Sequence, residues 1–296
     1  MEKSKVKKKE SKKEESKKEE SKTEESKKKT TLQVLPVNDP EEEDDWGNDV
    51  HENLPQVGGF GGGSLTLLIG AVRTGKSTLL SNFFLNPDFY GQEMFDYVKI
   101  MSNTISNDIT SRFMKEAFDV SDYYDDSIIS GIIENQKKFD KKSQPKIAII
   151  CDDLLGSVPR NGLLWSLCSR YRHYNIRMLI ISSQNYRQVS PIARQNCQNL
   201  VITSPFPNQK EMLKIAEEFG DVLGGDKQFL KIFKYATPDR YDTLHINLQD
   251  NPVTAWRNWT EKIATGNVTH FDSNSVDIGE FEGKNQTNEV IAKEDI

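Results

Sequence analysis

The stretch GAVRTGKST, Gly70 to Thr78, decides the fold of this chain. It follows SLTLLI, an apolar run with the length and composition of a buried strand, and it leads into KSTLLSNFFL, Lys76 to Leu85, with apolar residues at helical spacing. A strand, a loop and a helix in this order match the phosphate-binding P-loop pattern G-x-x-x-x-G-K-[ST]. Glycine permits the tight backbone path, and the exposed amides then point inward at a helix N-terminus that carries partial positive charge.

The P-loop predicts an ATP site with Mg²⁺. We expect Lys76 to bridge the β- and γ-phosphates and the Ser77 hydroxyl to ligate Mg²⁺. A second glycine cluster, at 58–63, comes before the strand and is remote from its carboxyl end, so we interpret it as a flexible entry to the domain. The residues expected to hold the nucleotide are Gly70, Ala71, Val72, Arg73, Thr74, Gly75, Lys76, Ser77 and Thr78.

A second apolar run ends in paired carboxylates. KIAIICDDLLG, Lys146 to Gly156, indicates a strand buried on both faces that ends at Asp152 and Asp153. In this position Asp152 would hold Mg²⁺, usually through water, and Asp153 would orient or deprotonate the attacking water. The alternative is a pair of exposed acids that begins a turn.

A third apolar run, IRMLIISSQ, ends in Gln184. If the run is a parallel strand, Gln184 lies at the same edge as the carboxylates and can report the γ-phosphate through its amide. A buried amide that caps the strand end is the alternative.

Strands and helices alternate through the middle of the chain. Further strands are expected at YVKIMS, NLVIT and Tyr241 to Leu248, and helices at Ile128 to Phe139, at 161–174, at Asn208 to Gly220 and at 225–237. This order predicts an α/β fold of the RecA/ASCE-like P-loop NTPase type, with a mostly parallel sheet, helices on both faces and the ligand at the carboxyl edge. A guanine-reading Asn-Lys-x-Asp motif and a Leu-Ser-Gly-Gly-Gln signature between the nucleotide motifs are both absent.

The two ends of the chain differ from its middle. Between Val6 and Leu32 a repeat of Glu, Ser and Lys contains no apolar residue, and the closing residues are again polar and acid-rich. We therefore predict a disordered charged tail at 1–53, a P-loop ATPase domain at 54–262 and a disordered acidic tail at 263–296. No run approaches the roughly 18 to 20 apolar residues of a membrane span. The 3 cysteines lack metal-site spacing and are interpreted as core residues.

The combination of GAVRTGKST, IAIICDDL, LIISSQ and VSPIARQNCQNLVI resembles the FtsK/HerA superfamily, most closely the poxvirus-type genome-packaging ATPases of large DNA viruses and virophages. The resemblance covers about Leu54 to Leu248. It implies a motor that uses ATP hydrolysis to move double-stranded DNA through a homo-oligomeric ring, a hexamer or pentamer, into a preformed capsid. It also implies contact with capsid proteins and a place in the host cytoplasm, at the viral factory, and in the virion.

The resemblance implies an arginine that acts in trans on the next subunit's ATP. Arg172, before the strand that ends in Gln184, is the first candidate, and Arg194 is the alternative. Pairing with surface acids is the other explanation of either arginine, and Arg73 inside the loop has no assigned role. At the level of function, a nucleotide-dependent switch or assembly factor without translocation stays open, and the net charge of −6 argues against a protein coated in positive charge.

Overall fold

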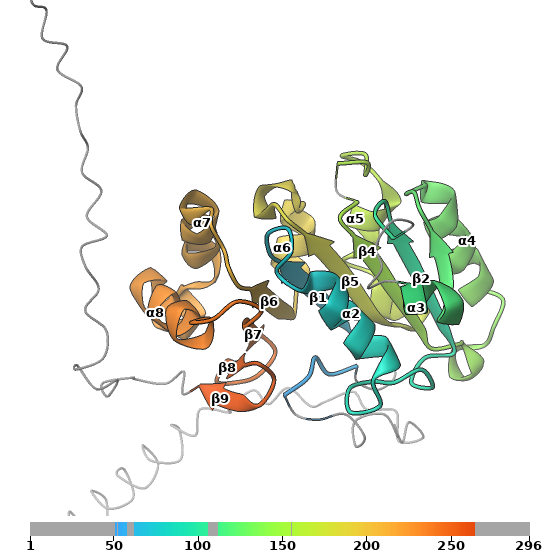
Figure 1. Cartoon of the computed structure of the whole chain (residues 1–296). Coiled ribbons are helices and arrows are strands. Elements are labelled where there is room, and N and C mark those ends of the chain that lie inside the picture. Colours follow the sequence, from blue (N-terminus) through green and yellow to red (C-terminus); the bar gives the residue numbers. More distant parts are fainter. Residues whose placement is uncertain (1–50, 52, 58–61, 106–111, 155, 264–296) are drawn as a thin grey trace, which may run out of the picture. The chain divides into compact units, whose positions relative to one another are not determined.

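The computed structural model describes residues 51, 53–57, 62–105, 112–154 and 156–263, all of them within one compact unit. Their strands form a nine-stranded sheet in the order β3-β2-β4-β5-β1-β6-β7-β8-β9 (Figure 1). From β3 to β6 neighbouring strands run parallel, and from β6 to β9 they run antiparallel. The predicted α/β fold with a mostly parallel sheet is confirmed.

The elements have these bounds. The strands are β1 Ser64–Ile69, β2 Tyr97–Ser102, β3 Asp119–Ser121, β4 Ile147–Asp152, β5 Ile176–Ser183, β6 Asn199–Thr203, β7 Thr243–Asn247, β8 Thr254–Arg257 and β9 Glu261–Ile263. The helices are α2 Lys76–Leu85, α3 Arg112–Ala117, α4 Asp126–Gln136, α5 Leu163–Leu167, α6 Pro191–Asn196, α7 Gln209–Phe219 and α8 Asp226–Ala236. Short 3-10 helices are η2 Lys141–Ser143, η3 Tyr171–Tyr174, η4 Tyr186–Gln188 and η5 Asp221–Leu223.

Each face of the sheet has its own apolar core. On one face, alternate β1 residues such as Leu65 and Leu67 pack with side chains of α4, α5, α6, α7 and α8. On the other, Leu68 packs with α2, α3 and Trp259. Helices therefore cover both faces, as predicted, and the central strands are buried along their whole length, which explains their continuous apolar sequences.

The register brings the polar strand ends together. Asp152, the last residue of β4, pairs with Ser102 at the end of β2 and with Ser182 near the end of β5. Ile69, the last residue of β1, pairs with Ser183 on one side and Ile202 on the other. The P-loop begins at this same carboxyl edge.

Several sequence predictions are corrected or bounded by the structure. The helix expected at 161–174 is broken into α5 and η3, and the sheet continues past the expected last strand through β8 and β9. Gly63, at the end of the glycine cluster interpreted as a flexible entry, is required for packing. Its φ is 109, and a Cβ there would lie 2.9 Å from the Ile176 carbonyl oxygen. The predicted tails lie almost entirely outside the described residues, so the domain boundaries stay predictions.

The assignment of the cysteines to the core is confirmed. The cysteines Cys151, Cys168 and Cys197 are buried free thiols. Trp165 and Phe229 are buried among the residues of the first core. Among the described residues, no helix has the length and apolar character needed to cross a membrane.

Candidate nucleotide site

The P-loop is held in place by its own side chains and by β6. The Gly70 amide donates to the Ser183 carbonyl at 3.1 Å, and the Thr74 hydroxyl donates to the Ala71 carbonyl at 2.8 Å. A Cβ on Gly70 would lie 1.8 Å from Oγ1 of Thr203, so glycine is required there by close approach. Gly75 adopts φ 89, a left-handed conformation suited to glycine. No side chain caps the α2 N-terminus, so its first amides remain available to a phosphate.

Lys76 is buried inside the loop. Its Nζ donates to the carbonyl oxygens of Gly70 at 2.9 Å and Ala71 at 3.1 Å, and it lies 3.9 Å from Oδ2 of Asp153. Burial lowers the pKa of Lys76, while the charges of Asp153 and Asp152 oppose that shift. A cation held by neutral carbonyls can move to phosphate oxygens at little cost, which suits the role predicted for this side chain.

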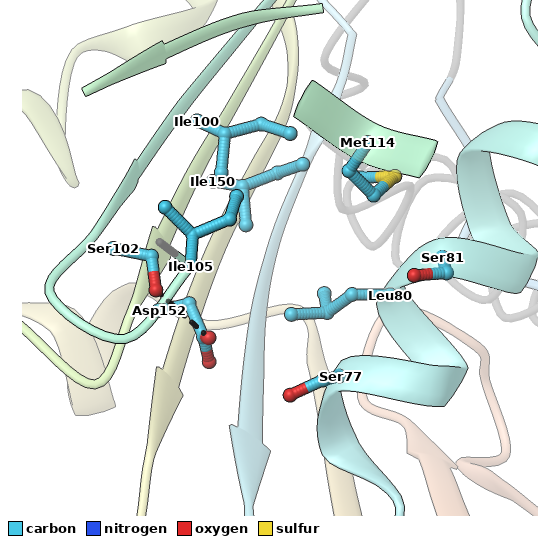
Figure 2. A pocket seen from close by; sticks show the side chains of 9 residues that line it. All are labelled: Ser77, Leu80, Ser81, Ile100, Ser102, Ile105, Met114, Ile150 and Asp152. Carbon is cyan, nitrogen blue, oxygen red and sulfur yellow. Dashed lines mark hydrogen bonds between the residues drawn. The ribbon is translucent and has the colours of Figure 1, made fainter. Parts of the chain in front are cut away.

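Asp152 ends β4 beside Ser102 of β2 and lies across from Ser77 of α2 (Figure 2). Its Oδ2 accepts a hydrogen bond from the Ser102 hydroxyl at 3.2 Å, while among the described residues Oδ1 is buried without a partner at hydrogen-bond distance, and Ser182 is near enough to oppose the rise in the pKa of Asp152. Burial is the main reason that the pKa of Asp152 is raised. A small cavity of about 10 Å³ is lined by both Asp152 and Ser77.

This donor set fits Mg²⁺. A hydroxyl and a carboxylate with an unpartnered buried oxygen are oxygen ligands of the kind that Mg²⁺ prefers, with water and phosphate oxygens supplying the rest of its shell. Within the described residues, no cluster of three or more His, Cys, Asp or Glu side chains forms a metal cage of its own. Ser77 and Asp152, the predicted metal ligands, therefore line the same small cavity, and their role as ligands stays a prediction.

Asp153 and Gln184 form the wall that faces the loop. The Gln184 amide nitrogen donates to Oδ2 of Asp153 at 2.9 Å, and Gln184 is exposed rather than a buried cap. Asp153 adopts φ 50, and its backbone amide donates to the Ser182 carbonyl at 3.1 Å. The structure thus joins the two side chains that were predicted to act on the water and on the γ-phosphate.

The P-loop, Asp153 and Gln184 line one cavity of about 420 Å³ at the carboxyl edge of the sheet. Its size suits a nucleoside triphosphate, and its walls combine the P-loop with the strand ends of β4 and β5. The lining residues are Val72, Arg73, Gly75, Lys76, Ser77, Thr78, Thr104, Asp153, Gln184, Arg240 and Tyr241. The chain has the P-loop NTPase fold.

The candidate trans arginines lie outside this P-loop cavity. Arg172 is in η3, before β5 begins, with its exposed guanidinium 5.9 Å from the Tyr171 ring centroid. Arg194, in α6, is ion-paired with Glu218 at 2.6 Å, and its side chain is 17% exposed. Arg194 therefore has the acidic partner that the alternative explanation required, whereas Arg172 keeps an exposed charge.

Four residues of the site were missed by the sequence patterns. Ser102 is the last residue of β2 and Thr203 is the last residue of β6, and a polar residue after an apolar run was the available signal for both. Arg240 and Tyr241 precede β7 in a loop for which no nucleotide motif exists, so only the folded chain reveals them.

Comparison with known proteins finds an uncharacterized viral protein and, among solved structures, a DNA-packaging ATPase and a conjugation coupling protein. No protein-family model matches the chain. Uncharacterized protein 075L of Invertebrate iridescent virus 6 is 26% identical over 241 residues, which are 78% of this chain and 89% of that protein.

Among solved structures, B204, the DNA-packaging ATPase of Sulfolobus Turreted Icosahedral Virus, gives a TM-score of 0.47 at 16% identity, over 65% of this chain and 96% of B204. The monomer form of the pCW3 conjugation coupling protein TcpA with ATPgS gives 0.44 at 12% identity, over 67% of this chain and 60% of TcpA.

Proposed function

We propose that the chain is an ATPase whose hydrolysis drives double-stranded DNA, with packaging of a viral genome into a preformed capsid as its task. The observation that carries the proposal is the convergence of Lys76, Ser77, Asp152, Asp153 and Gln184 at one sheet edge. Similarity to a viral protein, and to proteins described as a DNA-packaging ATPase and a conjugation coupling protein, supports the DNA substrate.

In the proposed reaction, water attacks the γ-phosphorus and the bond to the β–γ bridging oxygen breaks. Asp153 accepts the water's proton, and Gln184, already hydrogen-bonded to it, orients the water. Lys76 leaves the Gly70 and Ala71 carbonyls to neutralise the β- and γ-phosphates. ADP and inorganic phosphate are the products.

Ser77 and Asp152 would hold Mg²⁺ in this site. The ion, when bound, would neutralise charge on the β- and γ-phosphate oxygens. Asp152 needs such a counter-charge, since among the described residues its Oδ1 is buried without a partner at hydrogen-bond distance.

The proposed assembly is a homo-oligomeric ring, a hexamer or pentamer, in which Arg172 completes the next subunit's site. An arginine on the γ-phosphoryl oxygens typically raises the rate by about 10³ to 10⁵. In the chain's own site, the arginine side chain that donates to the P-loop backbone, within the described residues, is that of Arg240. Its acceptor is the Arg73 carbonyl.

Mixing experiments test the trans arginine. Arg172→Ala should bind ATP but hydrolyse it poorly, and mixing it with Lys76→Ala should restore part of the activity. Arg112→Ala, which removes an exposed arginine of α3, is the matched control and should keep full activity. Absence of rescue where subunits exchange would contradict the trans role but leave the P-loop assignment intact.

The proposal as a whole is tested by ATPase rates with and without DNA. Duplex DNA should raise the rate several-fold in the full-length protein, and single-stranded DNA of equal nucleotide concentration should raise it less. Lys76→Ala should abolish both the basal and the stimulated rate. Slow hydrolysis that is indifferent to duplex DNA would instead indicate the nucleotide-dependent switch or assembly factor. If duplex DNA stimulates the ATPase rate, we further propose that the protein contacts capsid proteins and is located in the host cytoplasm and the virion.

A further inference from the structure

Arg240 and Tyr241 form an outer wall of the P-loop cavity. The Arg240 guanidinium donates through Nη2 to the Arg73 carbonyl at 3.3 Å and lies 4.9 Å from the Tyr241 ring centroid. A Cβ on Gly75 would lie 3.4 Å from Cδ1 of Tyr241, so the ring rests against the loop where α2 begins. The pair is therefore anchored to the P-loop although it comes from the loop before β7.

The order of strands fixes which end of a nucleotide this wall meets. Asp153 follows β4 and Gln184 follows β5, both on one side of β1. Tyr241 precedes β7, whose Thr243 pairs with Thr203 of β6 on the opposite side of β1. If the γ-phosphate faces Asp153 and Gln184, the ribose and base extend toward β6 and β7. This step rests on the proposed function, since it takes the bound ligand to be a nucleoside triphosphate.

Tyr241 lies in a turn between α8 and β7. The Asp242 amide donates to the Asp239 carbonyl at 3.4 Å, and the Tyr241 amide donates to the Ser204 carbonyl at 3.1 Å, so the turn accounts for the φ of 75 at Tyr241. Tyr241 is nevertheless 57% exposed, although it is a large aromatic residue that lines the cavity. The fold therefore holds the backbone of Tyr241 in place while its ring is left open to the cavity.

We propose that Tyr241, held by Arg240, is the stacking platform for the base of the nucleotide. An aromatic ring with a guanidinium against it offers a flat, polarisable surface for a heterocyclic base. Stacking uses the face that every base has, so a platform of this kind does not by itself distinguish adenine from guanine. The site is therefore expected to bind ATP and GTP with similar affinity.

Binding measurements that separate base from phosphate test this platform. The dissociation constants of ATPγS, GTPγS and inorganic tripolyphosphate, each with Mg²⁺, are measured on the full chain by calorimetry. Tyr241→Ala should weaken both nucleotides by about 5- to 150-fold, the range expected for loss of one stacking contact, and leave tripolyphosphate unchanged. Tyr241→Phe should bind like the native chain. Tyr123→Ala, which removes another tyrosine that is 57% exposed, is the matched control and should change none of the three.

Tyr241→Gly separates a binding role from a structural one. Glycine accepts φ 75 without penalty, so the melting temperature of the nucleotide-free protein should stay the same or rise while nucleotide affinity falls. A lowered melting temperature would show that Tyr241 supports the fold, and would overturn the proposal. Equal loss of tripolyphosphate and nucleotide in Tyr241→Ala, or loss of neither, would also overturn it. These results leave the ATPase proposal standing, whereas native-like ATP hydrolysis by Lys76→Ala would remove the ATPase proposal itself.

Discussion

The two halves of the sheet differ in how they contribute to the site. The parallel half, β3 to β6, brings the residues predicted to bind phosphate and to act in hydrolysis to the carboxyl edge, at the ends of β1, β4 and β5. The antiparallel half, β7 to β9, follows the loop that carries Arg240 and Tyr241 and packs against the segment before β1. In the proposed account the chemistry therefore belongs to the parallel half, and the loop before the antiparallel half holds the base.

The antiparallel half is tied to the N-terminal segment by His245. Its ring lies stacked on Trp259, with centroids 4.7 Å apart. Nδ1 lies 2.9 Å from the Asn53 carbonyl oxygen, and Nε2 lies 2.9 Å from the Asn199 side-chain amide. Burial lowers the pKa of His245 to about 3, which favours the neutral ring, while the hydrogen bond with the Asn53 carbonyl opposes that shift.

The largest expected effect is on the chemistry of the parallel half. Asp153→Asn keeps the hydrogen-bonding shape beside Gln184 but removes the proton acceptor. The turnover number should fall by about 10²- to 10⁴-fold, and the dissociation constant for ATP should stay within a few-fold of native. Steady-state turnover and calorimetry measure the two quantities. Near-native turnover would show that Asp153 is not the water-activating acid.

The next effect is on the stability of the antiparallel half at low pH. Since the pKa of His245 is lowered on folding, the unfolded chain takes up its proton first as the pH falls below about 6.5. The stabilisation is therefore present above that pH and is lost as the pH falls toward about 3, at roughly 1.4 kcal/mol per unit. Denaturant titrations at several pH values should show a decline between pH 6.5 and 5 that is about 2 kcal/mol smaller in His245→Gln than in the native chain.

The matched control for that titration is His173→Gln, which changes an exposed histidine of η3 and should keep the native decline. Parallel stability curves for the native chain and His245→Gln would contradict a buried neutral ring.

The smallest expected effect is on the free energy of unfolding, through the contact between Gly70, which follows β1, and Thr203, which ends β6. Gly70→Ala places a methyl group 1.8 Å from Oγ1 of Thr203 and should lower the free energy of unfolding by about 1 to 3 kcal/mol. Thr203→Ala removes the main obstacle, so the double variant should lose less than the two single losses added together. Additive losses in urea titrations would mean that the loop moves away from β6 without cost.

The sequence was sufficient for the parallel half because its signals are local. Lys76 and Ser77 belong to a contiguous loop motif, and Asp152, Asp153 and Gln184 directly follow apolar runs whose burial on both faces is visible in their composition. Parallel strands then bring their carboxyl ends to one edge whatever the details of packing.

The features that the sequence did not predict depend on contacts between segments that are distant in the chain. β8 and β9 are only short strands of mixed polarity, and the chain at 161–174 looks helical by spacing although it breaks between α5 and η3. Tyr241 reaches the P-loop only because β7 pairs antiparallel with β6, and no local pattern records that pairing. Arg194 looked like a candidate finger until folding placed Glu218 beside it.

A structure of the chain with Mg²⁺ and a non-hydrolysable ATP analogue tests the division between the two halves most directly. The γ-phosphate should lie against Asp153 and Gln184, the metal between Ser77 and Asp152, and the base against Tyr241. A nucleotide bound in the reverse direction, with its base toward β4 and its phosphates toward β7, would contradict this division of the site.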